Sequence, residues 1–320
     1  MARPSNPMKL AYVFPGQGSQ WVGMGRDLCD HFDVARDIFR QADEKLGFPL
    51  SRLCFEGPED ELRQTINAQP AMVTMSFACL QAARTVAGGN GLPSPAFVAG
   101  HSLGEYTALA AAGVLDFAST VYLARERGRL MHQAGQQPPG GMAAVIGLAE
   151  DRLAEVCALT DTRIANYNCP GQLVISGAAA NLTRASELAK AGGAARVIPL
   201  AVSGAFHSPL MQPAADGLAK VIASLDFRDA AVPIIANTTA RPVTGASAIK
   251  AELLTQLCNS VHWQRSIEYT INQGVNTFYE IGPGKVLSGL IKRINQAVNI
   301  RNIGEAQAIA ELANASSPAQ

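Results

Sequence analysis

A serine between two glycines is the clearest candidate for chemistry in this chain. Gly100, Ser102 and Gly104 fit the G-x-S-x-G pattern, in which a sharp strand-to-helix turn exposes the central hydroxyl. The apolar run 97–99 predicts the strand, and the alanine- and leucine-rich segment 103–112 predicts the helix. The pentapeptide alone fits an N-capping serine equally well. The flanking strand and helix favour a nucleophile whose oxyanion faces free N–H groups at the helix start.

One of the five histidines has a context that suits a general base. Ser208 and Pro209 form a typical N-cap and first-turn pair, which predicts a helix through Leu225 with His207 at its N-terminus. The positive end of the helix dipole disfavours imidazolium, so we expect a neutral ring that accepts a proton near pH 7. His262 is the main alternative, and any single histidine can be structural.

An arginine near an apolar helix face is a candidate for anion binding. Asp116 is a good N-cap for a helix over 117–132. Arg125 and Arg129 share one face of this helix, whereas Arg127 lies beside the apolar stripe. A buried arginine is costly unless an anion meets it. An internal glutamate and a substrate carboxylate both satisfy that requirement, and the periodicity does not separate them.

A glycine-rich loop follows the apolar run 10–14, which predicts a strand. The loop, 15–20, lacks the third glycine of a dinucleotide fingerprint because Trp21, where a helix is predicted to begin, stands there. The Gly-Lys pair at 284–285 fails the Walker pattern because Val286 replaces Ser or Thr. What remains is a tight loop, with Gln17 at its middle, whose backbone N–H groups can face a ligand.

Composition limits the class of protein. The 320 residues are 48% hydrophobic and 16% charged, which suffices for a sizeable core in one large domain, alone or with a smaller one. The formal net charge is zero, so the basic excess of a nucleic-acid binder is missing. We expect no leader and no membrane span. Six scattered cysteines without a C-x-x-C pair predict free thiols in a reducing cytoplasm and no metal site.

The pattern changes after a proline- and glycine-rich linker at 136–141. The next segments follow a βαββαβ order, which is typical of a ferredoxin-like module. We therefore predict a small subdomain, 137–201, inserted in a larger α/β body. Its predicted elements are a strand at 142–146, a helix at 151–159, strands at 163–167 and 172–176, a helix at 181–191 and a strand at 195–200.

Segments on either side of this subdomain predict the larger body. They are helices within 33–88, interrupted at 47–49 and 56–58, a strand at 234–237, helices at 250–258 and 264–273, a strand at 278–281 and a helix at 286–294. Residues after 294 predict a short strand and a weak helix.

Six separated motifs resemble those of the malonyl-CoA:acyl-carrier-protein transacylases of fatty-acid and polyketide synthesis, over about 10–294. They are Phe14-Pro-Gly-Gln-Gly-Ser-Gln20, Gly100-His-Ser-Leu-Gly-Glu-Tyr106, Arg127-Gly128, Pro170-Gly-Gln172, Gly204-Ala-Phe-His-Ser208 and Glu280-Ile-Gly-Pro-Gly-Lys285. The resemblance implies an α/β-hydrolase-like body, 8–136 and 202–303, with the ferredoxin-like subdomain at 137–201 and a C-terminal tail at 304–320.

The resemblance also implies a role for each matching residue. Ser102 would be the nucleophile and His207 its base. The backbone N–H groups of Gln17 and Leu103 would form the oxyanion hole, and Arg127 would bind the free carboxylate of malonate.

Two further assignments follow from the same family pattern. Phe206 resembles the bulky residue that favours malonyl over methylmalonyl groups. A backbone carbonyl near an Asn-x-Val-x-Trp segment orients the histidine in this family, commonly at a glutamine. In this chain the matched position is His262, which departs from the pattern.

The implied reaction moves a malonyl group from malonyl-CoA to the phosphopantetheine thiol of an acyl carrier protein through an acyl-serine, without a bound cofactor. A thioester hydrolase on the same elbow is the alternative. In related editing hydrolases the carboxylate-binding arginine is lost, whereas Arg127 is present. A non-catalytic docking module would lack the nucleophile or the base, whereas Ser102 and His207 are both present.

Overall fold

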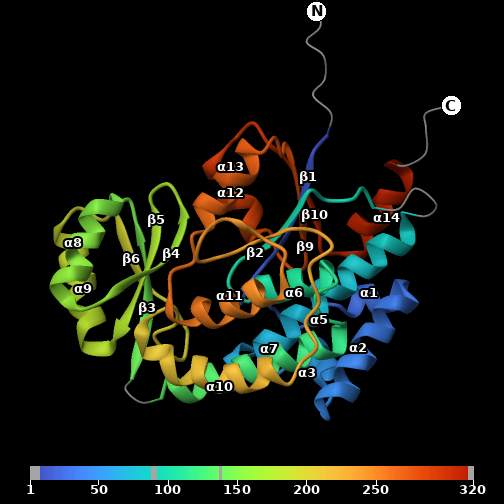
Figure 1. Cartoon of the computed structure of the whole chain (residues 1–320), viewed down its shortest axis with the longest axis horizontal. Helices are drawn as coiled ribbons and strands as arrows, with labels where there is room; N and C mark the ends of the chain where they lie inside the picture. Colours follow the sequence, from blue (N-terminus) through green and yellow to red (C-terminus); the bar gives the residue numbers. More distant parts are fainter. Residues whose placement is uncertain (1–7, 88–91, 137–138, 316–320) are drawn as a thin grey trace, which may run out of the picture.

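The computed structural model of the protein describes residues 8–87, 92–136 and 139–315, and shows a mixed α/β chain in two units (Figure 1). The larger unit surrounds a six-stranded sheet of order β10-β9-β1-β2-β7-β8. Its strands are β1 Leu10–Phe14, β2 Phe97–Gly100, β7 Ile234–Ile235, β8 Pro242–Val243, β9 Thr277–Ile281 and β10 Asn299–Ile303. All neighbouring pairs are parallel except β7 and β8.

Helices cover both faces of this sheet, which explains why its central strands are continuous apolar runs. The helices are α1 Arg26–His31, α2 Asp33–Leu46, α3 Leu50–Glu56, α4 Glu59–Arg63, α5 Thr65–Val86, α6 Gly104–Ala111, α7 Phe117–Ala134, the 3₁₀ turn η2 Pro209–Met211, α10 Gln212–Ala223, α11 Ala246–Cys258, α12 Trp263–Asn272, α13 Val286–Ile294 and α14 Ala306–Ala315. Every side chain of α5 from Ala68 to Leu80 is buried, so this helix forms the centre of the main core.

The smaller unit has the predicted βαββαβ order and lies to the left in Figure 1. Its elements are β3 Gly140–Ile146, α8 Glu150–Thr160, β4 Arg163–Cys169, β5 Gln172–Ala178, α9 Ala179–Ala191 and β6 Arg196–Pro199. The sheet is antiparallel, in the order β4-β5-β3-β6. Alternation along β3 turns Ala143 and Val145 toward the core under the helices, while Met142 faces the larger unit.

Strand β4 is the edge that joins the two units. Val261, which precedes α12, donates its backbone N–H to the carbonyl of Ala165 at 2.8 Å and accepts from Tyr167 N–H at 2.9 Å. These bonds satisfy an edge that would otherwise be open. They also fix the side chains of β4 next to the end of the central sheet.

The structure differs from the sequence prediction at several boundaries. No helix begins at Trp21, because Gly23 and Gly25 take positive φ angles of 104° and 85° and delay the first helix to Arg26. The predicted helix after Ser208 opens with the 3₁₀ turn η2, and strand β8 was not predicted. Residues 137–138 of the predicted linker lie outside the described residues.

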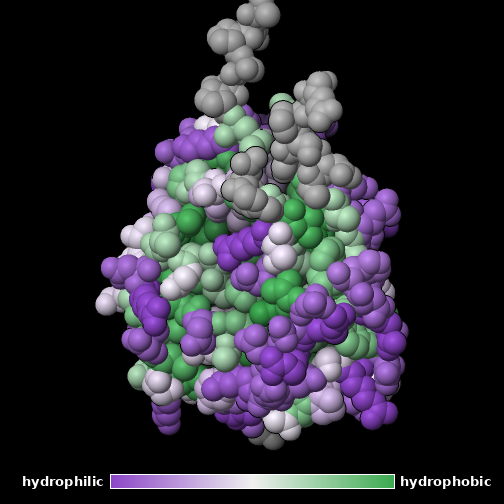
Figure 2. Space-filling view, turned by 90° about the vertical axis from the view of Figure 1, so that its right-hand side faces the viewer, coloured by the Kyte–Doolittle hydropathy of each residue, from purple (hydrophilic) through white to green (hydrophobic). Residues whose placement is uncertain are grey.

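The packed body also continues beyond residue 303, into the segment predicted as a tail. Helix α14 contributes Ile309 and Leu312 to the main core, and Asp27 accepts a hydrogen bond from the N–H of Ala306 at its first turn. Hydrophilic residues alternate with small hydrophobic areas on the side of the molecule shown in Figure 2, as on ordinary solvent-facing surfaces. Within the described ranges, no helix is long and apolar enough to cross a membrane.

Candidate active site

The predicted strand-turn-helix around Ser102 is present, between β2 and α6. Ser102 has a φ of 51°, a left-handed conformation that costs energy for a residue with a side chain. Both flanking glycines are sterically required. A Cβ on Gly100 would lie 1.9 Å from the carbonyl carbon of Gly104, and one on Gly104 would lie 2.0 Å from the carbonyl oxygen of Phe14. The close approach of strand and helix at this turn is therefore possible only with glycine at both positions.

Asn237 holds the strained turn from the neighbouring strand. It lies two residues after the end of β7 and is 2% exposed. It accepts from the N–H of Ser102 at 2.7 Å and donates to the carbonyl of Gly100 at 2.7 Å. One amide thus binds the backbone on both sides of His101. Asn237 was not among the predicted site residues, although a polar residue ends the apolar run of the predicted strand 234–237.

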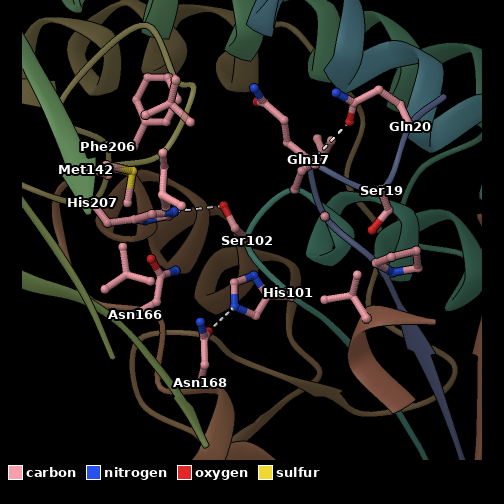
Figure 3. A pocket seen from close by; sticks show the side chains of 18 of the residues that line it. Gln17, Ser19, Gln20, His101, Ser102, Met142, Asn166, Asn168, Phe206 and His207 are labelled. Carbon is pink, nitrogen blue, oxygen red and sulfur yellow. Dashed lines mark hydrogen bonds between the residues drawn. The ribbon is translucent and has the colours of Figure 1, made fainter. Parts of the chain in front are cut away.

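Ser102 and His207 point toward each other across the pocket (Figure 3). The distance from Ser102 Oγ to His207 Nε2 is 2.8 Å, although 105 positions separate the two residues. His207 Nδ1 lies 2.8 Å from the backbone carbonyl of Gln256. Because a carbonyl only accepts, the proton belongs on Nδ1, and Nε2 is left as the acceptor that faces the hydroxyl.

The orienting carbonyl comes from Gln256, so the prediction of His262 for this role is wrong. The backbone of His262 instead donates to the carbonyl of Asn237 at 2.8 Å, and its ring stacks on Tyr167 with centroids 4.7 Å apart. Gln256 lies in the last turn of α11, where backbone carbonyls have no intrahelical partner. The free end of a helix supplies the acceptor, and not the segment that follows it.

The neutral state predicted for His207 has a cause besides the expected helix dipole. His207 is 4% exposed, and burial together with the nearby Arg127 guanidinium lowers its pKa from 6.5 to about 3. The Gln256 carbonyl opposes this shift in pKa. His207 therefore stays unprotonated, and able to accept a proton, over the whole physiological range.

We expect the rate of Ser102 acylation to stay nearly constant from pH 8 to pH 5. A histidine with an ordinary pKa of 6.5 would lose about 30-fold over that interval, whereas His207, with a pKa of about 3, is already fully in its basic form. The kcat/KM of the loading step, measured by rapid quench across this range, checks the prediction. A decline with a midpoint near pH 6.5 would contradict it.

The same shift has a consequence for stability, and the sign follows from linkage. The folded-state pKa of His207 is below the unfolded value, so the unfolded chain takes up the proton first and stability falls as the pH drops below about 6.5. Urea titrations should show a shallower decline for His207→Asn than for the native chain. Equal slopes would show that His207 does not contribute.

Arg127 is buried, 1% exposed, and meets the same hydroxyl from α7. Its Nη2 donates to Ser102 Oγ at 3.2 Å and to Gln256 Oε1 at 2.8 Å, and its Nη1 donates to Gln69 Oε1 at 2.9 Å. Throughout the described part of the chain, no carboxylate oxygen lies within 4.0 Å of this guanidinium. The internal salt bridge considered as an alternative is therefore not formed.

The residues predicted to form an oxyanion hole lie beside the elbow. Gln17 and Leu103 line the same pocket as Ser102, and within the described residues neither backbone N–H donates to another protein group. The glycine-rich loop packs tightly here, since a Cβ on Gly16 would lie 2.4 Å from the carbonyl oxygen of His101. The side chain of Gln17 donates to Thr65 Oγ1 at 3.2 Å, away from the hydroxyl of Ser102.

The pocket has a volume of about 490 Å³ and is lined by both units, within the usual size of a small-molecule site. Phe206 and Met142 lie beside His207 in Figure 3. On the other side of Ser102, His101 Nε2 and Asn168 Oδ1 of β4 are 2.8 Å apart, so a hydrogen bond joins the elbow to the smaller unit. The pocket between the two units therefore reaches Ser102.

The mainly parallel sheet thus carries a strained turn at Ser102, whose hydroxyl lies between His207 and the buried Arg127. Residues 11–313 match the acyl transferase domain family, and the chain belongs to it.

Within this family the chain is similar to the malonyl CoA-acyl carrier protein transacylases. It is 47% identical to the one of Bacillus subtilis, over 94% of this chain and 95% of that protein, and 42% identical to the one of Escherichia coli K12, over 94% and 98%. Two solved structures have TM-scores of 0.92: the acyl-carrier-protein-S-malonyltransferase of Bartonella henselae (41% identity, 97% and 99% coverage) and a malonyl-transacylase in complex with its type II polyketide synthase acyl-carrier protein (38%, 96% and 99%).

Proposed function

We propose that this protein transfers a malonyl group from malonyl-CoA to the phosphopantetheine thiol of an acyl carrier protein, through an acyl ester on Ser102. The observation that carries the proposal is the position of one hydroxyl 2.8 Å from the base His207 and 3.2 Å from the guanidinium of Arg127. The malonyl transacylases at 42–47% identity support the same reaction.

In the first half-reaction, Ser102 Oγ attacks the thioester carbonyl carbon while His207 Nε2 takes the hydroxyl proton. The carbonyl oxygen becomes an oxyanion and accepts hydrogen bonds from the N–H groups of Gln17 and Leu103, worth about 3–4 kcal/mol each. The carbon–sulfur bond then breaks, and His207 returns its proton to the thiolate of CoA. The product is malonyl-Ser102.

The second half-reaction reverses these steps with a new thiol. The phosphopantetheine sulfur attacks the ester carbonyl, its proton passes to His207, and the carbon–oxygen bond to Ser102 breaks. His207 reprotonates the serine and the malonyl thioester leaves on the carrier. The cycle is ping-pong, and it needs no resident cofactor or metal.

Arg127 would select the acyl group, because its two terminal nitrogens can bind a carboxylate as a pair. An acetyl group would leave the guanidinium without an anion. Phe206, buried beside the base, would disfavour a branch on the α-carbon.

The two units support a description as an α/β-hydrolase-like catalytic body, residues 8–136 and 202–303 extended by helix α14, with a ferredoxin-like subdomain at 137–201. The sheet order β4-β5-β3-β6 and the βαββαβ sequence favour the second name. Free cysteines, five of them buried, support a reducing, cytoplasmic location.

Transfer and hydrolysis are separated by following the fate of the malonyl group. With malonyl-CoA and a holo acyl carrier protein, we expect malonyl-carrier to form at least tenfold faster than free malonate. Without an acceptor, intact-protein mass spectrometry should show a malonyl adduct on the enzyme. The apo carrier, which lacks the thiol, is the control. Release of malonate at the same rate with either carrier would indicate a hydrolase.

A further inference from the structure

The side chain of Gln256 is the centre of a buried polar cluster behind the nucleophile. It is fully buried in α11, and its amide Nε2 donates to the carbonyl of Ser102 at 3.0 Å and to Glu105 Oε2 at 2.5 Å. Its Oε1 accepts from Arg127 Nη2 at 2.8 Å. The main-chain carbonyl of the same residue binds His207. The side chain and the backbone of Gln256 therefore hold different parts of the site.

Among the residues that the structure describes, this arrangement leaves the charge of Arg127 without a counter-ion. The acceptors around the guanidinium are the side-chain oxygens of Gln69, Gln256 and Ser102, all neutral. Burial is the main cause that lowers the pKa of Arg127 from its ordinary value. A buried cation with only neutral partners is unfavourable, so this site binds an incoming anion more strongly than a neutral group.

A carboxyl group of the protein lies directly behind the amide. Glu105 of α6 is 1% exposed and accepts from Gln256 Nε2 and, at 3.4 Å, from the backbone N–H of Asn237. Burial raises the pKa of this carboxyl well above its usual range, nearby Glu252 adds to the rise, and the Arg127 guanidinium opposes it. Without the amide between them, Arg127 and Glu105 could form a direct ion pair.

We propose that the Gln256 side chain is a positioning residue that separates Arg127 from Glu105 and so leaves the guanidinium free for the carboxylate of the acyl substrate. An amide suits this place because its oxygen faces the cation and its N–H₂ faces the carboxyl group. A carboxylate already paired with Arg127 would have to be displaced by the substrate. This inference rests on the proposed role of Arg127 as the carboxylate-binding group.

A purely structural role for Gln256 makes a different prediction. Loss of packing or of the bond to the Ser102 carbonyl would slow malonyl and acetyl loading together. Loss of the separation would slow malonyl loading selectively, because an acetyl group does not use Arg127. Side-chain substitutions keep the main-chain carbonyl that orients His207, so the base is retained in each variant. The ratio of malonyl to acetyl loading rate constants is therefore the informative quantity.

The experiment measures this ratio for three variants by quenched-flow and intact-protein mass spectrometry. Gln256→Glu places a carboxylate against Arg127, and Gln256→Met removes the amide with little change in volume. We expect each to lower the malonyl-to-acetyl ratio at least tenfold. Adding Glu105→Gln to Gln256→Met removes the competing carboxyl group and should restore at least half of the lost selectivity on a logarithmic scale.

A matched control lies on α12, where Gln264 Nε2 donates to Glu268 Oε1 at 2.8 Å with no arginine attached to the pair. Gln264→Met should leave the ratio within threefold of the native value. The proposal is overturned if Gln256→Met keeps the native ratio, or if the double variant is no more selective than the single one.

Arg127→Ala separates this failure from failure of the proposed function. If Arg127→Ala abolishes the selectivity while Gln256→Met retains it, the carboxylate-binding role holds and only the separating role of Gln256 is wrong. If Arg127→Ala keeps the native ratio, both assignments are wrong. Should Gln256→Glu fail to fold, the Gln256→Met pair still decides the question.

Discussion

Replacing Ser102 with alanine should lower the turnover of malonyl transfer by about 10⁴-fold or more, the scale on which serine nucleophiles contribute. The variant keeps the pocket, the base and the arginine, so malonyl-CoA can still bind. It lacks the atom that forms the ester. Substrate binding should therefore persist while covalent loading disappears.

The measurement is the intact mass of the enzyme after incubation with malonyl-CoA, together with malonyl-carrier formation. Ser224→Ala is the matched control, because that serine lies at the end of α10 and its hydroxyl donates to the local carbonyl of Val221 at 2.7 Å. The Ser224→Ala variant should accept the malonyl group at the native rate. A malonyl adduct that survives in Ser102→Ala would place the acyl group on another residue and remove the basis of the ping-pong mechanism.

The elbow could be predicted from sequence because its requirements are local. Close approach of strand and helix excludes a Cβ at Gly100 and Gly104, and the two glycines of the pentapeptide already indicate this. The βαββαβ unit was predictable for a similar reason, since its alternating and helical periods are short-range patterns. All six elements come from one continuous stretch of the chain, although β3 pairs with β5 and β6 rather than with β4.

The polar groups that organise the site could not be derived in this way. Gln69, Gln256 and Asn237 come from α5, α11 and the end of β7, and each reaches the elbow only after the chain has folded. A signal for Gln256 did exist, because it lies on the apolar stripe of its helix with Ile249 and Leu253. A lone amide on an apolar stripe needs a buried hydrogen-bond partner, as Arg127 does. Only the arginine, however, carries a charge whose burial is costly enough to attract notice in a sequence.

The error at His262 shows the limit of matching by spacing. The family pattern locates a carbonyl near the Asn-x-Val-x-Trp segment, but the sequence does not say which carbonyl lacks a partner. That depends on where α11 ends. The helix stops at Cys258, which frees the last-turn carbonyls and puts the one of Gln256 against His207. The terminus itself was predicted correctly at 258, but the role was assigned from the motif and not from the free carbonyls of the helix end.

Arg127→Ala should invert the preference of the enzyme among acyl groups. Malonyl loading is expected to fall about 10²- to 10⁴-fold, because a buried carboxylate would lose a charged partner worth roughly 3–5 kcal/mol. Acetyl loading should change less than threefold, since a methyl group does not use the guanidinium. For Arg127→Lys we expect a rate of malonyl loading between those of the native enzyme and of Arg127→Ala. An ammonium keeps the charge but cannot bind both carboxylate oxygens in one plane.

Competition between malonyl-CoA and acetyl-CoA for Ser102, read from the masses of the two adducts, gives the ratio in one experiment. Arg125→Ala is the control, because this arginine lies two positions away on the same helix and donates instead to the carbonyl of Ile66 and to Asn67. It should leave the ratio within threefold. Equal losses for both acyl groups in Arg127→Ala would mean that the arginine supports the elbow through its bond to Ser102 Oγ and does not recognise the substrate carboxylate.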